Sequence, residues 1–94
     1  MSQLEALRRA VALSPENLPL LLLFAEACLG EFQPAEACTA YERVLEVDPS
    51  HRDARLGLAR ALNQTGRLSE AIVRMEAMVR DHPRDPEVRR LLSR

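Results

Sequence analysis

The chain has 94 residues and a formal net charge of −1, and it contains one Tyr, two Phe and no Trp. A chain of this size forms one small domain, and its Leu- and Ala-rich composition favours closely packed helices over a β-sandwich. The low net charge excludes strong electrostatic attraction to nucleic acid or anionic lipid. The charge is uneven, because residues 1–50 carry three Arg and eight acids (−5) whereas residues 51–94 carry ten Arg and six acids (+4). Such an asymmetry is usual for solvated helix faces, but it would also let an acidic half meet a basic half.

Apolar residues recur at helical spacing along most of the chain, with breaks at Gly and Pro. This pattern predicts six helices, near residues 2–13, 17–30, 34–47, 51–65, 68–81 and 85–93. The first segment has the period of an amphipathic helix and lacks the layout of a signal peptide. The second holds an apolar run from Leu18 to Leu29 that includes Glu26 and is shorter than the roughly twenty residues of a membrane span. We therefore expect a soluble, cytoplasmic protein.

Residues near the predicted helix ends suit those positions. Gly66 can adopt the left-handed conformation that closes a helix. Ser50, with Asp53 three residues later, is placed to cap the fourth helix. Asp85 and Pro86 combine a capping residue with a proline that fits the first helical turn.

The chain contains an internal repeat of 34 residues, which is the spacing of Pro15, Pro49 and Pro83. Many other residues match at the same step: Leu22 and Leu56, Ala25 and Ala59, Ala27 and Ala61, Glu36 and Glu70, Ala37 and Ala71, Glu42 and Glu76. So many matches in one register indicate stacked copies of one helical hairpin. Stacking would place residues that are one period apart in the same row.

Helical hairpins of this period, with small residues at fixed places, resemble the tetratricopeptide repeat family. The resemblance rests on small positions, a large apolar site and a closing proline: Ala25, Ala59, Ala37, Ala71, Tyr41, Met75, Pro49 and Pro83. It implies an all-α fold, a right-handed α-α superhelix (solenoid) of about six antiparallel helices. Residues 1–94 would form a single domain, with a leading second helix at 2–15, full repeats at 18–51 and 52–85, and a trailing first helix at 86–94.

Two departures from the family pattern affect details of the prediction. The aromatic residue often found early in the first helix is replaced by Leu21 in one copy and Arg55 in the other. Phe32 stands where a turn glycine is usual, with Gly30 two places earlier, which predicts a slightly irregular first turn.

In this family the first helix of each repeat lines a concave groove. The predicted groove residues are Leu22, Glu26, Leu29, Leu56, Arg60, Asn63 and Arg90, with Arg94 on the same stripe. An exposed apolar stripe edged by charge is the usual sign of a peptide or helix partner. Alternatively, this helix is simply very hydrophobic, or helix 2–13 covers it. The Lys, Asn and Arg with which some family members grip a chaperone C-terminus are absent from the matching positions, since those hold Leu22, Leu23, Glu26, Leu56, Gly57 and Arg60.

No catalytic, cofactor-binding or metal-binding pattern is recognisable in the sequence. Cys28 and Cys38 lack metal-type spacing and lie at apolar helical positions, which predicts buried free thiols. His51 and His82 lie in turns beside prolines, where they can help to cap a helix. We expect neither enzymatic activity nor a cofactor.

Three functions remain open at this stage. The first is a protein-interaction module or scaffold that binds a partner peptide or helix in its groove. The second is self-assembly into a homo-oligomer through the terminal helices, because the last one presents Val88, Leu91 and Leu92. The third is a regulatory or recruiting arm of a larger enzyme such as an ATPase. Neither a nucleic acid nor a membrane is an expected partner.

Overall fold

The computed structural model describes residues 2–92, without the side chains of Leu91 and Leu92. The described chain forms six helices and no strand: α1 (Gln3–Leu13), α2 (Leu18–Gly30), α3 (Pro34–Val47), α4 (Arg52–Gln64), α5 (Leu68–Asp81) and α6 (Pro86–Leu92). Each predicted helix start, and each predicted end from the first helix to the fifth, lies within one residue of the observed position. The predicted end of the last helix, residue 93, lies outside the described residues. The periodicity of apolar residues therefore located every helix correctly.

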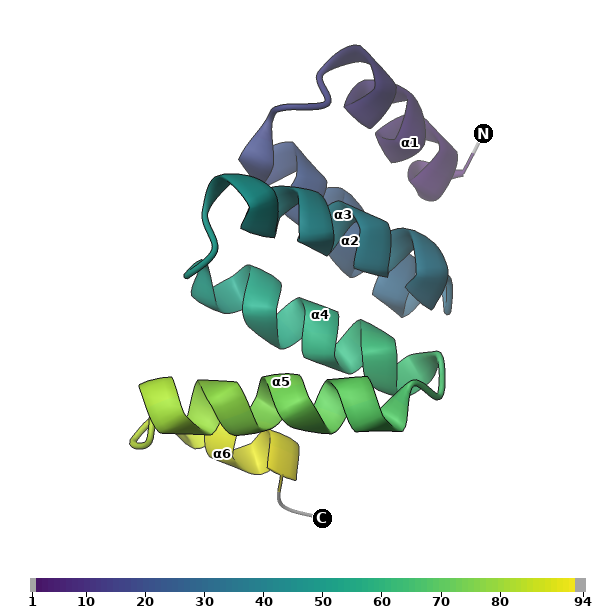
Figure 1. The fold of residues 1–94 in the computed structure, drawn as a ribbon. Helices are drawn as coiled ribbons and strands as arrows, with labels where there is room; N and C mark the ends of the chain where they lie inside the picture. Colours follow the sequence, from purple (N-terminus) through teal and green to yellow (C-terminus); the bar gives the residue numbers. More distant parts are fainter. Residues whose placement is uncertain (1, 93–94) are drawn as a thin grey trace.

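The six helices form an elongated stack of 39 × 24 × 20 Å (Figure 1). Each helix packs mainly against its neighbours in sequence, and α2 also contacts α4 directly. The helices α1 and α6 lie at opposite ends of the stack (Figure 1). This arrangement is an all-α repeat of helical hairpins, as the 34-residue period predicts.

Side-chain caps stand at the start of several helices, among them α2 and α4. The Asn17 side chain accepts a hydrogen bond of 3.2 Å from the Leu20 backbone N–H at the start of α2. At the start of α4, Nδ1 of His51 accepts a hydrogen bond of 3.2 Å from the backbone N–H of Ala54. The prediction that Ser50 caps this helix is wrong, since the Ser50 hydroxyl donates to Asp48 instead. His51 is the residue directly before α4, so its side chain reaches the free N–H groups of the first turn.

The turns within the two hairpins use the left-handed backbone region at equivalent places. Gly66 has φ 82° between α4 and α5, and Phe32 has φ 55° between α2 and α3. These residues are 34 positions apart, so the same turn is built once with glycine and once with phenylalanine. The left-handed region is strained for a residue with a Cβ atom. The backbone hydrogen bonds of the two turns are nevertheless equivalent, so the expected irregular first turn is not found.

Small residues allow the helices to approach closely. Ala25, Ala37, Ala59 and Ala71 are all fully buried. They lie in pairs on the first and second helices of each hairpin, at the positions that the repeat register predicts. A larger side chain at any of them would overpack the core at a cost of roughly 1–3 kcal/mol.

The ring of Tyr41 packs directly onto the backbone of α4. A Cβ atom on Gly57 would overlap the Tyr41 side chain, so only glycine fits at that position. Tyr41 is 2% exposed and joins α3 to α4 within the main hydrophobic cluster. A pair of one large and one small residue thus sets the distance between the two repeats.

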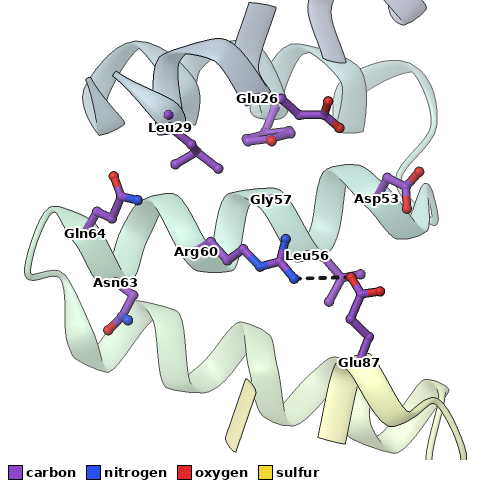
Figure 2. A pocket seen from close by; sticks show the side chains of 11 residues that line it. Glu26, Leu29, Asp53, Leu56, Gly57, Arg60, Asn63, Gln64 and Glu87 are labelled. Carbon is purple, nitrogen blue, oxygen red and sulfur yellow. Dashed lines mark hydrogen bonds and ion pairs between the residues drawn. The ribbon is translucent and has the colours of Figure 1, made fainter. Parts of the chain in front are cut away.

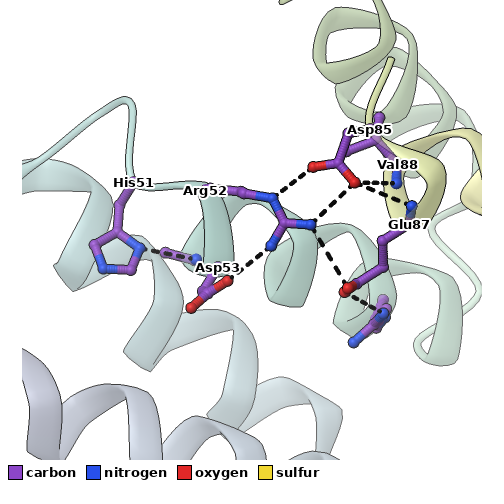
Figure 3. A network of polar contacts seen from close by, with 8 residues as sticks. His51, Arg52, Asp53, Asp85, Glu87 and Val88 are labelled. Atoms are coloured by element: carbon purple, nitrogen blue, oxygen red, sulfur yellow. Dashed lines mark hydrogen bonds and ion pairs between the residues drawn. The ribbon is translucent and has the colours of Figure 1, made fainter. Parts of the chain in front are cut away.

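Two bidentate ion pairs connect helices across the stack. Arg8 on α1 donates two hydrogen bonds, of 2.7 and 2.9 Å, to the carboxylate of Glu36 on α3. The hydrogen bond from Arg8 lowers the pKa of Glu36. Arg52 on α4 donates two hydrogen bonds, of 2.6 and 3.1 Å, to Asp85 just before α6 (Figure 3). The Arg52 guanidinium lowers the pKa of Asp85 to about 2.

Asp85 also caps α6, as the sequence predicts. Its Oδ1 accepts hydrogen bonds from the backbone N–H groups of Glu87 (3.0 Å) and Val88 (3.4 Å), which Figure 3 shows together with Arg52. The same carboxylate therefore starts α6 and fixes it to α4. This contact places α6 beside α4 at the end of the stack.

None of the helices in the described residues combines the length and the apolar character needed to cross a bilayer.

Candidate functional site

A cavity of about 620 Å³ opens on the side of the stack that the first helix of each hairpin forms (Figure 2). Its lining comes from α2, α4 and the start of α6, with one residue from α3: Glu26, Leu29, Gly30, Tyr41, Asp53, Leu56, Gly57, Arg60, Asn63, Gln64 and Glu87. The α4 residues follow helical spacing along a single face. The cavity is therefore a direct product of stacking helices in one register.

The polar groups of the cavity differ between its two ends. Asp53 lies at the N-terminal end of α4, and Asn63 and Gln64 lie at its C-terminal end. Figure 2 shows Glu26 and Glu87 toward the Asp53 end, and Leu29 toward the two amides. The cavity thus has an acidic end and an amide end with an apolar side chain beside it.

Arg60 lies between these two ends and points toward α6 (Figure 2). Its guanidinium forms an ion pair of 3.2 Å with Glu87. Both side chains are about half exposed, at 50% and 44%. Exposed pairs of this kind contribute about 0–1 kcal/mol, so the pair can open when another charged group enters the cavity.

Tyr41 contributes a buried aromatic side chain to the cavity wall. Burial, followed by the negative charge of Glu26, raises the pKa of Tyr41 to about 12. The hydroxyl therefore stays protonated and can both donate and accept a hydrogen bond. Within residues 2–92 this hydroxyl is not a buried unpaired group, because it is open to the cavity.

Five of the seven predicted groove residues line this one cavity. They are Glu26, Leu29, Leu56, Arg60 and Asn63. Leu22 instead packs half-buried against the main hydrophobic cluster. Arg90 is exposed on α6 and is not among the lining residues. Arg94 lies outside the described residues.

The expectation that Leu56 forms part of an exposed apolar stripe is wrong. Leu56 is only 2% exposed, because it packs with Met78 and Val88 in a second hydrophobic cluster. Leu29 remains half-buried, so it is the main apolar contact that the cavity offers. The cavity is consequently more polar than the leucine run suggested.

Sequence reasoning missed several lining residues, including Asp53, Gln64 and Glu87. Asp53 and Gln64 lie on the same helical face as Leu56 and Arg60, so helical spacing could have identified them. Tyr41 belongs to a second helix, and no periodic signal places its side chain at the cavity. The Tyr41 side chain can lie at the cavity because Gly57, on the facing helix, has no Cβ atom.

The two cysteines are not among the residues that line this cavity. Cys28 and Cys38 are buried free thiols, as predicted, and burial raises the pKa of Cys28 to about 11. Burial raises the pKa of Cys38 as well. Within residues 2–92, no group of three or more His, Cys, Asp or Glu side chains is placed to hold a metal ion.

The stacked hairpins and the hollow along their first helices define a helical-repeat protein. The family model for the tetratricopeptide repeat matches residues 29–94, more than half of the chain, and the chain belongs to this family. A comparison with curated proteins finds no match. Members of the family are typically non-catalytic and generally mediate protein–protein interaction.

Proposed function

We propose that this chain binds a short segment of a partner protein in the cavity between α2, α4 and α6. The single observation that supports this most is the cavity itself, because it lies along the first helices and combines an apolar side chain with free hydrogen-bonding groups. Binding sites for peptides combine such features, with apolar pockets for side chains and polar groups for the peptide backbone.

The size of the cavity suits an extended peptide segment. The α4 face from Asp53 to Gln64 spans about 16 Å at a rise of 1.5 Å per residue. An extended segment of about five residues covers this length. The amides of Asn63 and Gln64 can then pair with its backbone, while Leu29 contacts one of its apolar side chains.

The wall of the cavity is well packed without a partner. Gly57, Leu58 and Ala59 at the middle of α4 are all buried, which holds the helix between its neighbours. A preformed site loses little conformational entropy on binding, so a small contact area can still give useful affinity.

A steric block of the cavity tests this proposal without changing its charge. Peptides would first be selected against the chain from a displayed random library, and their affinity measured by isothermal titration calorimetry. We expect Gln64→Trp, which fills the amide end, to lower the affinity of the selected peptides at least about tenfold. Ser69→Trp is the matched control, since Ser69 is an exposed neutral residue on α5 outside the cavity lining. Equal affinity for both variants would place the binding surface elsewhere and reject the cavity.

Self-assembly through the terminal helices has weaker support. An apolar hollow on α1 includes Leu13, which is 86% exposed. However, α1 carries one Glu and two Arg, and α6 also carries one Glu and two Arg. Each helix therefore has a local charge of +1, so electrostatics does not favour their contact. The opposite charges of the two halves of the chain therefore do not lie on the two terminal helices. The cavity is the better candidate for the binding surface.

A further inference from the structure

The cavity and its immediate neighbours carry an excess of negative charge. Four carboxylates surround its acidic end, and two guanidinium groups compensate them: Glu26, Asp53, Asp85 and Glu87 against Arg52 and Arg60. The sum is −2. Because the formal charge of the whole chain is only −1, this excess is a local property of the site.

The four carboxylates differ in how far they are already neutralised. Asp85 uses both oxygens for Arg52 and for the cap of α6. Glu87 is shared between Arg52 at 3.5 Å and Arg60 at 3.2 Å. The negative charge that remains available therefore belongs to the other two carboxylates.

Glu26 and Asp53 are these two acids. Asp53 has one contact, of 3.1 Å, with Arg52, and its side chain stays 66% exposed. Glu26 is exposed and has no ion-pair partner among the described residues. Both line the cavity at the same end (Figure 2). A cation at this end of the cavity would be attracted by both negative charges.

The hydroxyl of Tyr41 is a further polar group that the cavity offers to an occupant. The residue is 2% exposed, and its side chain lines the cavity. The hydroxyl is open to the cavity, so water can satisfy it when no partner is bound. A bound segment can take the place of that water through a backbone carbonyl or a side-chain N–H.

Resting on the proposed function, we infer that the cavity selects a partner segment that carries an Arg or Lys side chain beside an aliphatic one. The cation lies between Glu26 and Asp53, and the aliphatic side chain contacts Leu29. An acidic segment fits less well, because Arg60 is the only cation in the lining within residues 2–92 and it is already paired with Glu87.

Three matched peptides of about seven residues test the charge preference. They share one leucine and the same neutral background without aromatic residues, and differ only by Arg, Gln or Glu at two fixed positions flanking it. Tyr41 is the single tyrosine in a chain without tryptophan, so its fluorescence reports occupation of the cavity. We expect the Arg peptide to bind about tenfold more tightly than the Gln peptide, and to lose this advantage at about 1 M salt.

Isosteric neutralisation of the two acids assigns the preference to this site. The double variant Glu26→Gln with Asp53→Asn should remove the advantage of the Arg peptide over the Gln peptide. The matched control is Glu46→Gln with Glu76→Gln, which changes the net charge equally at exposed positions of α3 and α5. A loss of the same size in the control would overturn the inference, since the effect would then come from net charge alone.

The possible outcomes separate this inference from the proposed function. Tighter binding of the Glu peptide, or equal binding of all three, would overturn the charge preference. If Gln64→Trp still weakened the binding of whichever peptides bind, the cavity would remain the binding site. If none of the three peptides bound and the library peptides ignored Gln64→Trp, both the preference and the proposed function would be wrong.

Discussion

The two complete hairpins, α2–α3 and α4–α5, occupy equivalent places in the stack but bury their first helices to different depths. Leu22 and Leu56 are one period apart, yet Leu22 is half-buried whereas Leu56 is 2% exposed. Leu56 packs with Met78 and Val88. One period earlier, the equivalents of these two covering residues are Val44 and Ala54, which are both smaller.

This difference shows that a residue's repeat position does not by itself determine its exposure. The register decides which way a side chain points, and the size of its neighbours decides how much of it is covered. In this chain the first copy has smaller covering residues, so its leucine keeps part of its surface. The second copy has larger ones, so its leucine belongs to the core.

Introducing a charge at each of the two leucines should produce the largest contrast between the hairpins. We expect Leu56→Asp to lower the free energy of unfolding by about 3–5 kcal/mol, because it buries an unpaired carboxylate. Leu22→Asp should cost about 1–2 kcal/mol, since water still reaches that site. Urea denaturation followed by far-ultraviolet circular dichroism measures both. Leu23→Asp, at a residue that is 50% exposed, is the control and should have a small effect. Equal costs for the two leucines would show that the covering residues do not determine their burial.

Most of the fold could be predicted because it depends on local signals. Helix positions follow from apolar spacing, and the buried alanines follow from a repeat that is visible by eye. Asp85 before Pro86 marked the start of α6 correctly, since a cap and a first-turn proline act within a few residues of each other.

The predictions that were wrong depend on which of several neighbouring residues forms a given contact. Ser50, His51 and Asp53 are all plausible caps near the start of α4, and only the backbone geometry selects His51. The burial of Leu56 depends on Val88, which is 32 residues later in the chain. The position of Tyr41 depends equally on a residue in another helix. Such contacts between repeats leave no periodic trace in the sequence.

Adding one methyl group to Gly57 should give the next largest effect. We expect Gly57→Ala to lower stability by about 1–3 kcal/mol through overlap with Tyr41, despite the higher helix propensity of alanine. Gly30→Ala is the matched control, because a Cβ atom there meets no atom within 4 Å. Chemical denaturation of both variants measures the difference.

The residues at the equivalent position of the first hairpin suggest how the overlap is relieved. Leu23 stands where the second hairpin has Gly57, and Leu7 stands one period before Tyr41. We therefore expect Gly57→Ala to cost much less in a Tyr41→Leu background. A cost that is the same in both backgrounds would mean that glycine is required for a reason other than the tyrosine ring.

Substitutions in the two left-handed turns should change the free energy of unfolding in opposite directions, and by the smallest amounts. Phe32→Gly should raise the free energy of unfolding by about 0.5–1 kcal/mol, because it relieves the left-handed backbone and the side chain is 79% exposed. Gly66→Ala should lower it by about 1 kcal/mol, since it introduces a Cβ atom at φ 82°. Thermal denaturation measures both changes.

Phe32→Leu separates the backbone from the side chain in this test. Leucine keeps the Cβ atom and the strain, so we expect stability close to that of the native chain. If Phe32→Gly and Phe32→Leu both destabilised the chain equally, the aromatic ring would be making a stabilising contact in spite of its exposure. The first turn would then differ from the second because phenylalanine stabilises it, and not because the chain tolerates a strained residue there.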